Sequence, residues 1–217
     1  MQVGVTLWLL NGVTAALAPV TAAQSVSGKA YGALVQGPGG TQQSALAVLP
    51  AVSLADGAMA DSDADSLNVP GTITTEALTG TTSGSIGDAA AAQSVATVFN
   101  VNLLNGLITA SSLTATVSST TNGVQATSNA LGSTLGDLVV NGVHVTWGDR
   151  AVAPNTRMNL PGVGYVVLNE QRRTGDGVRT SGLTVNLIHV YLQSLILGVL
   201  KTTGQIIVGS ASSKAAM

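Results

Sequence analysis

The sequence predicts an all-β protein, an antiparallel β-sandwich of the jelly-roll or immunoglobulin-like kind, and three observations lead to that prediction. Short apolar runs recur along the chain, separated by Gly, Asn and Asp at the spacing of roughly 8–12 residues that is typical of sandwiches. No long amphipathic helix can be traced between them. Hydrophobic residues make up 45% of the 217 residues and charged residues only 8%, so the chain has enough apolar surface to fold around a core.

The first 25 residues are predicted to be an apolar N-terminal segment, and residues 26–217 a single β-sandwich domain. No charged residue precedes Lys29. β-Branched residues near the start favour a strand over a helix, and one face of that strand would carry Val3, Val5, Leu7 and Leu9. The segment also resembles the apolar core of a secretory signal peptide, although the basic start is missing. It is therefore expected either to be removed on export or to insert into a neighbouring subunit as a donor strand.

Asn-Gly pairs mark the tightest predicted turns, because both residue types tolerate the positive φ of a type I′ turn. These pairs are Asn105-Gly106, Asn122-Gly123 and Asn141-Gly142. The apolar runs around them, 97–104, 107–118, 138–140 and 143–147, are predicted strands. A further hairpin is predicted between 164–171 and 178–190, with residues 174–177 at its tip, and 206–208 would be the last strand. Residues 55–66, rich in Asp and Ala, are predicted to be a long loop.

Charge and cysteine content exclude several classes of protein. Eight Lys and Arg, a net charge of −2 and a pI near 5.5 leave no basic surface for nucleic acid. The absence of cysteine excludes disulfides, thiolate metal sites and a cysteine nucleophile. The apolar run at 183–200 is interrupted by Asn186, His189 and Gln193, so it indicates a buried strand and not a stable membrane span. A mean hydropathy of +0.42 suggests that a partner covers part of the surface.

An ordered set of short runs between residues 30 and 212 is similar to the choice-of-anchor P family of exported bacterial surface proteins. The set comprises Ala30-Tyr31-Gly32, Val69-Pro70-Gly71, the run from Val101 to Ala110, Asn159 to Gly164, Leu168 to Gln171 and Leu183 to Val190. The resemblance implies export, a cell-surface or extracellular location and no assigned catalytic activity.

The strongest metal candidate in the sequence is the alternating run Asp61, Asp63 and Asp65. It is similar to the opening of a calcium loop, but an EF-hand needs Gly at its sixth position and Glu at its twelfth. Ser66 and Thr72 occupy those positions. A solvated acidic loop is therefore the expected role, with loose calcium binding as the alternative and no other cofactor.

No catalytic residue is predicted, and the protein is not expected to be an enzyme. A Gly-x-Ser-x-Gly elbow is absent, and nothing in the sequence places two carboxylates across a cleft. His144 and His189 are the only histidines. Strand alternation places His144 and Trp147 on opposite faces of a strand, and it places His189 on the same face as Leu187 and Tyr191.

Two hypotheses of different classes follow. The first is a secreted structural protein, a subunit of a self-assembling extracellular fibre or surface matrix, whose N-terminal strand completes a neighbouring copy's sheet. The second is a monomeric cell-surface module that binds a glycan, calcium or a protein partner. Acidic residues gather before residue 90 and basic residues between 150 and 179, which favours stacking of copies if the two regions lie at opposite ends.

Overall fold

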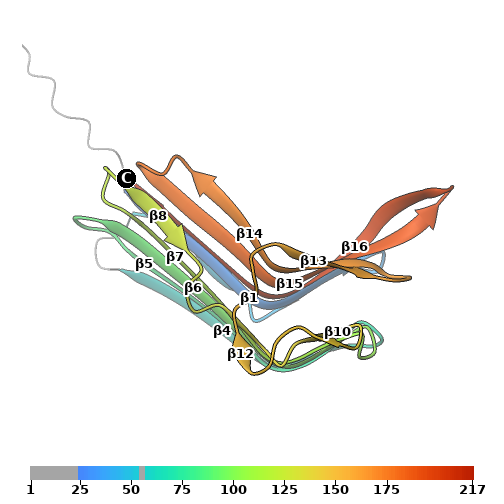
Figure 1. The fold of residues 1–217 in the computed structure, drawn as a ribbon. Helices are drawn as coiled ribbons and strands as arrows, with labels where there is room; N and C mark the ends of the chain where they lie inside the picture. Colours follow the sequence, from blue (N-terminus) through green and yellow to red (C-terminus); the bar gives the residue numbers. More distant parts are fainter. Residues whose placement is uncertain (1–23, 54–56) are drawn as a thin grey trace, which may run out of the picture.

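The computed structural model describes residues 24–53 and 57–217, which form 16 β-strands and no helix (Figure 1). The predicted all-β class and sandwich architecture are confirmed, because two antiparallel sheets pack face to face. The strands are β1 (Ser25–Gly37), β2 (Gly40–Ser44), β3 (Ala47–Val52), β4 (Ala58–Val69), β5 (Ile73–Ser85), β6 (Ala90–Leu103), β7 (Ile108–Thr121), β8 (Ala126–Asn129), β9 (Thr134–Gly136), β10 (Val139–Val140), β11 (Val143–His144), β12 (Asp149–Arg150), β13 (Thr156–Leu160), β14 (Gly164–Gly175), β15 (Thr180–Ile196) and β16 (Val199–Ala216).

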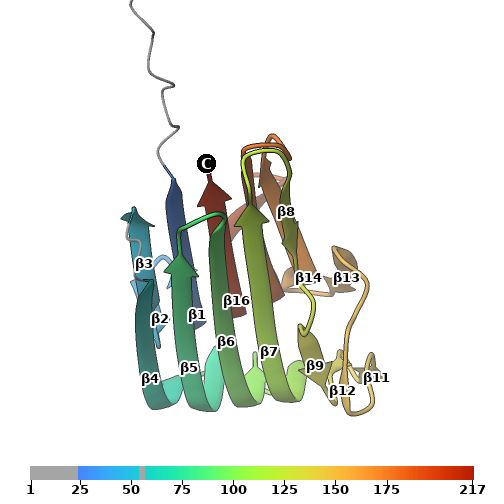
Figure 2. The ribbon, with the colours of Figure 1, turned by 90° about the vertical axis from the view of Figure 1, so that its left-hand side faces the viewer.

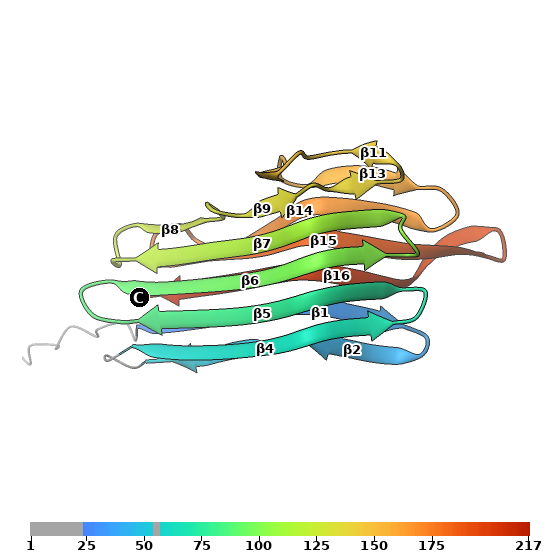
Figure 3. The same cartoon turned by 90° about the horizontal axis from the view of Figure 1, so that it is seen from below.

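One sheet, called sheet A here, has the order β13-β14-β15-β16-β1-β2, with β3 also paired to β1. The other, sheet B, has the order β11-β10-β7-β6-β5-β4, with β8 and β9 paired to β7 and β12 paired to β9. Seen from the side of sheet B, β4 lies at one lateral edge of the sandwich and β13 and β14 lie toward the other (Figure 2). The long strands of both sheets run in nearly the same direction (Figure 3).

The chain turns at all three predicted Asn-Gly pairs, but at Asn122-Gly123 only the glycine has a positive φ, 81°, so that turn is not of type I′. Asn141 and Gly142 have φ of 50° and 75° between β10 and β11, and Asn105 and Gly106 have φ of 57° and 89° between β6 and β7. The predicted hairpin at 164–190 is also present, as β14 and β15.

The loop predicted at 55–66 is wrong for most of its length, because residues 58–69 form strand β4. Its partly buried side chains alternate with exposed ones, and Asp61, Asp63 and Asp65 all lie on the exposed side. The aspartates are therefore the solvent-facing half of a regular strand pattern. β4 is also the edge of sheet B, where charged side chains discourage pairing with another chain.

Small residues bring the two sheets very close together toward the end that holds the start of β1. Three hydroxyls bridge the sheets there: Ser94 donates to the Ser212 carbonyl oxygen over 2.7 Å, and Ser119–Ser213 and Ser128–Ser181 lie 2.7 and 2.6 Å apart. A Cβ on Gly80 would lie 2.5 Å from the Ala45 carbonyl oxygen and 3.0 Å from that of Ala30. Small residues are therefore required where the sheets are this close.

Both sheets bend at a transverse crease (Figure 1). In sheet A, Asn169 and Leu187 lie at the same level of their strands but are not directly paired, and the same holds for Leu187 and Gly209. Asn169 and Gly209 have φ of 49° and 65°. In sheet B, Ala77 and Asn100 have φ of 41° and 50° where the register is interrupted. In sheet A the pairs on either side of each skipped position keep the same register, so the neighbouring strands bend together at the same level.

The two ends of the molecule differ. At one end β1 starts beside the end of β16, with Ser25 opposite Ala216. At the other end the β15–β16 hairpin extends beyond the rest of the molecule (Figures 1 and 3). The predicted donor-strand residues Val3, Val5, Leu7 and Leu9 lie outside the described residues, but their point of attachment, Gln24, lies at the end opposite the hairpin.

Candidate functional site: the projecting hairpin

The tip of the β15–β16 hairpin is a concentrated set of exposed large apolar side chains. Leu197 is 99% exposed, and its neighbours are exposed by between 41% and 69%: Leu195, Ile196, Val199 and Leu200. Single exposed apolar residues are ordinary, but a contiguous group on a projecting element marks an interaction site.

The backbone of this tip is also open on both sides. Within β15–β16 the pairs Ser194–Lys201, Leu195–Leu200 and Ile196–Val199 continue to the turn. The neighbouring strands stop earlier, since β14 begins at Gly164 opposite Leu192 and β1 reaches only Gly37. Among the described residues, no strand pairs with the outer edges of this two-stranded ribbon. An exposed apolar ribbon with free edges is a template for pairing with another chain.

A hollow of about 620 Å³ lies beside the ribbon, between β15 and the β13–β14 turn. Its walls include Leu160, Val163, Leu195 and Leu200, with Arg157 at its border. A smaller hollow of about 440 Å³ lies on the other side, near the β1–β2 turn, and Gln36, Thr202, Thr203 and Gln205 are among the residues that line it. The two edges of the hairpin therefore offer different chemistry to a partner.

The turn that closes the hairpin holds Leu197 in an unfavourable conformation. Leu197 and Gly198 have φ of 51° and 79°, the two positive values of a type I′ turn. Asn is the residue type suited to the first of these positions, whereas a bulky side chain there is uncommon. A fully exposed leucine at this point contributes nothing to the core.

A buried polar cluster centred on Glu170 lies at the crease of sheet A. Glu170 is 8% exposed, and its carboxylate accepts hydrogen bonds from Asn186 Nδ2 (2.8 Å), His189 Nδ1 (2.7 Å), Tyr191 Oη (2.8 Å) and Arg172 Nη2 (3.1 Å). Burial alone would raise the pKa of Glu170, but these donors outweigh it, His189 foremost, and hold the pKa well below its usual range. Burial, aided by donation to Glu170, raises the pKa of Tyr191 to about 12.

Aromatic and amide groups extend this cluster across sheet A. Tyr191 stacks between His189 (3.9 Å between ring centroids) and Tyr165 (4.6 Å), and the Arg157 guanidinium lies 3.8 Å from the Tyr165 ring centre. His189 Nε2 contacts Gln205 Oε1 at 2.8 Å, and Gln205 donates to Gln36 over 2.7 Å. Because these groups satisfy one another, the cluster is suited to rigidifying the crease.

The sequence identified His189 and Glu170 individually but not their contact, and one predicted neighbour is wrong. Tyr191 shares a face with His189, whereas Leu187 lies in the hydrophobic core. Leu187 has no direct pairing with Gly209, and the simple alternation on which that prediction relied is broken at this position. The prediction for His144 is also wrong. Its ring stacks on that of Trp147, with 3.9 Å between the ring centroids, and does not lie on the opposite face. The reason is that β11 ends at His144 and the chain then bends.

Asp61, Asp63 and Asp65 form an exposed acidic row on β4. Among the described residues, no group of three or more His, Cys, Asp or Glu side chains is arranged to hold a metal ion. The basic residues Arg157, Arg172 and Arg173 lie on β13 and β14. Acidic and basic strands thus lie toward opposite lateral edges (Figure 2), and not at the two ends of the strand axis that head-to-tail stacking through charge would require.

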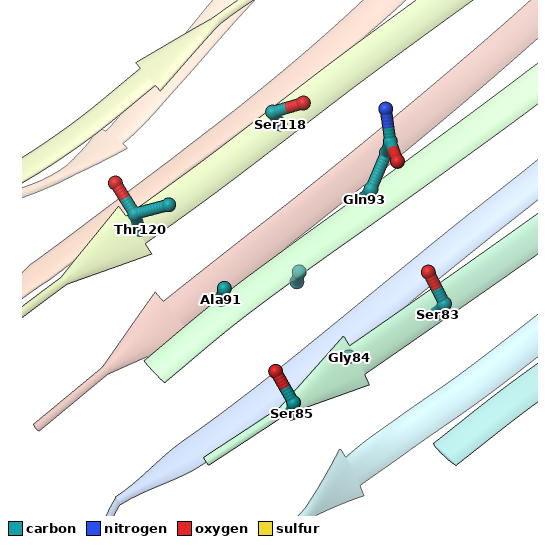
Figure 4. Close-up of a pocket in the computed structure, with 8 residues that line it drawn as sticks. Ser83, Gly84, Ser85, Ala91, Gln93, Ser118 and Thr120 are labelled. Carbon is teal, nitrogen blue, oxygen red and sulfur yellow. The ribbon is translucent and has the colours of Figure 1, made fainter. Parts of the chain in front are cut away.

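The outer face of sheet B carries a shallow depression of about 390 Å³ (Figure 4). Uncharged polar side chains surround it: Ser83, Ser85, Gln93, Ser118 and Thr120. They project from three neighbouring strands, and the small residues Gly84 and Ala91 lie among them. The face is polar and regular, but it lacks the enclosed shape of a small-molecule site.

Comparisons with known protein families, curated protein sequences and solved structures found no match to this chain. In the part of the chain that the structure describes, no helix is long and apolar enough to cross a membrane.

Proposed function

We propose that this protein is a non-enzymatic structural subunit that is exported and polymerises, head to tail, into an extracellular fibre or surface matrix. The N-terminal segment of one copy completes the sheet of the next. One observation carries the proposal: the apolar hairpin with free edges lies at the opposite end of the molecule from Gln24, where the apolar N-terminal segment is attached. When one end of a copy binds the unlike end of the next copy in a straight line, each added copy leaves a free end, so the assembly grows into a filament.

Export and the lack of catalysis are supported less directly. The runs between residues 30 and 212 resemble those of exported surface proteins, and this resemblance favours an extracellular location. The Glu170 carboxylate is the most strongly perturbed acid among the described residues for which a shift is resolved. Its four donors come from the same sheet, so a role in holding the crease accounts for it without a substrate.

The decisive experiment is electron microscopy of the purified native material, with N-terminal sequencing of the same sample. Ordered filaments whose chains begin at or near Met1 are expected. A variant lacking residues 2–23 should stay monomeric, while Thr79→Ser on the exposed face of β5 serves as a full-length control. Filaments formed by the truncated variant, or native particles that are monodisperse and begin near Gln24, would contradict the proposal.

The alternative is a monomeric surface module, and the groove of about 440 Å³ beside the crease favours a glycan as its ligand. Tyr191, Gln36, Gln205, Thr202 and Thr203 line this groove, and amides and hydroxyls are the groups that bind sugar hydroxyls. Glycan-array binding by a monomeric sample that starts near Gln24, lost on Gln36→Ala, would favour this alternative.

A further inference from the structure

This inference rests on the proposed function and identifies the acceptor. We infer that the free edge of β15 at Ser194–Ile196, with the hollow beside it, binds the apolar N-terminal segment of a second copy. In that complex the segment adds a strand next to β15, in line with the start of β14, and the row Val3, Val5, Leu7 and Leu9 faces Leu195 and Leu200.

The free edge supplies the first part of the argument. Gly164 is the first residue of β14, and beyond its partner Leu192 the outer side of β15 meets only one backbone contact from the β13–β14 turn, Gln193 N–H to the Val163 carbonyl oxygen at 2.7 Å. From Ser194 onward that edge has no partner strand among the described residues. Isolated two-stranded ribbons are marginally stable in water, so a third strand would complete the ribbon.

The chemistry of the two edges selects β15 over β16. The hollow on the β15 side is the larger of the two, about 620 Å³, and Leu160, Val163, Leu195 and Leu200 line it together with Arg157, Asn159, Gln193 and Ser194. On the β16 side, the hollow of about 440 Å³ is lined by glutamines and threonines, and Pro38, which has no N–H to donate, stands at its border. An incoming row of valine and leucine side chains matches only the first hollow.

The N-terminal segment has the length needed to reach a neighbouring copy. Residues 10–24 can span at most about 50 Å when extended, which is enough to link Gln24 to a strand docked on the tip of the copy behind it. To reach its own hairpin the same residues would have to follow β16 from Ala216 to Leu200, about 50 Å along the strand, and would have to be almost fully extended. The arrangement of the ends therefore favours binding between copies.

Strand alternation specifies which side chains come together. Leu195 and Leu200 are paired, and Ser194 and Lys201 form the next pair on the other face of the ribbon. If Val5 and Leu7 face Leu195, then Thr6 lies on the face of Ser194. A cysteine at Thr6 and one at Ser194 would then fall within the Cα separation that a disulfide allows.

Disulfide trapping tests this directly, because the natural chain contains no cysteine. One full-length preparation carries Thr6→Cys and a second carries Ser194→Cys; they are mixed, assembled, oxidised and analysed on a non-reducing gel, with electron microscopy of the same sample. Asp63→Cys on the exposed face of β4 and Lys201→Cys on the β16 edge replace Ser194→Cys as matched controls. Gly4→Cys and Trp8→Cys repeat the test one register step to either side.

Filaments with a mixed dimer at Ser194, at least tenfold above both controls, are the expected result. Filaments that cross-link through Lys201 or Asp63 instead would overturn the acceptor while leaving the proposed function standing. Dimers of Ser194→Cys alone, without the Thr6 partner, would indicate hairpin-to-hairpin pairing and also overturn it. A doubly substituted chain that closes an internal disulfide, while the mixture does not cross-link, would show binding within one copy. The absence of both filaments and cross-links would contradict the proposed function itself. If the protein in that case floated with phosphatidylcholine vesicles, the result would indicate that the hairpin binds lipid.

Discussion

Leu197→Asn should change folding stability and assembly in opposite directions. Leu197 sits at φ 51° in the hairpin turn, and a non-glycine residue in the left-handed region costs of order 1–3 kcal/mol. Asn tolerates this region far better and forms the favoured Asn-Gly pair with Gly198. Because Leu197 is 99% exposed, its removal takes nothing from the core. The free energy of unfolding should therefore rise by about 0.5–1 kcal/mol, which corresponds to roughly 1–4 °C in Tm for a chain of this size.

Assembly should respond the other way. Burying a fully exposed leucine in an interface contributes about 1.5–3 kcal/mol, so its loss should raise the critical concentration for filament formation roughly 10- to 100-fold. Thermal unfolding below the critical concentration measures the first effect, and light scattering across a dilution series measures the second. Val178→Asn, in the opposite turn and 49% exposed, is the matched control for assembly. The reasoning is refuted if Leu197→Asn assembles like the natural protein, or if the variant unfolds more easily than the natural protein.

Three further predictions concern the fold that presents the hairpin. Glu170→Gln turns an NH₂ group toward one pair of the carboxylate's donors and loses about two hydrogen bonds to a charged group, so denaturant unfolding should show a loss of about 3–6 kcal/mol. The exposed Glu76→Gln should cost under about 0.5 kcal/mol. Because the pKa of Glu170 is lowered in the folded state, its stabilisation is complete above the unfolded pKa near 4.3 and is lost as the pH falls further. The raised pKa of Tyr191 gives the opposite limit, with stability lost between about pH 10 and pH 12, so unfolding curves that are flat across both ranges would contradict this assignment. Gly80→Ala should destabilise by about 1–3 kcal/mol, since its Cβ meets two carbonyl oxygens of the facing sheet, whereas Gly39→Ala, with open space around it, should unfold like the natural protein.

The regular parts of the fold could be predicted from the sequence because their signals are local. Asn141-Gly142 specifies a type I′ turn through the conformational freedom of two adjacent residues, and the structure has that turn.

The error at 55–66 shows the limit of composition. The content of three aspartates favours a loop, but their spacing of two residues is typical of a strand with one solvent-exposed face.

The Glu170 cluster could not be assembled from sequence because its geometry depends on interrupted registers. Asn186 and His189 are three residues apart, which places them on opposite faces of an ideal strand. The skipped pairing at Leu187 returns both to one face, where they contact the same carboxylate oxygen. Only pairing across three strands reveals such an irregularity. The nearest local signals are Gly209 and Asn169, residue types that tolerate positive φ.

The position of the exposed apolar residues also depends on the whole fold and not on the local sequence. High mean hydropathy predicts that some surface needs a cover, but it cannot say where. In the structure one contiguous part of the apolar excess is exposed at residues 195–200, because β14 and β1 end before the hairpin does. Three aspartates, meanwhile, lie on the lateral strand β4, and three arginines lie on β13 and β14 at the other lateral edge. In the proposed assembly, apolar contact would therefore act along the strand axis, and Coulomb attraction between these edges would act across it. Salt screens the second and leaves the first intact, so raising ionic strength from about 0.01 to 1 M should separate bundled filaments sideways without shortening them.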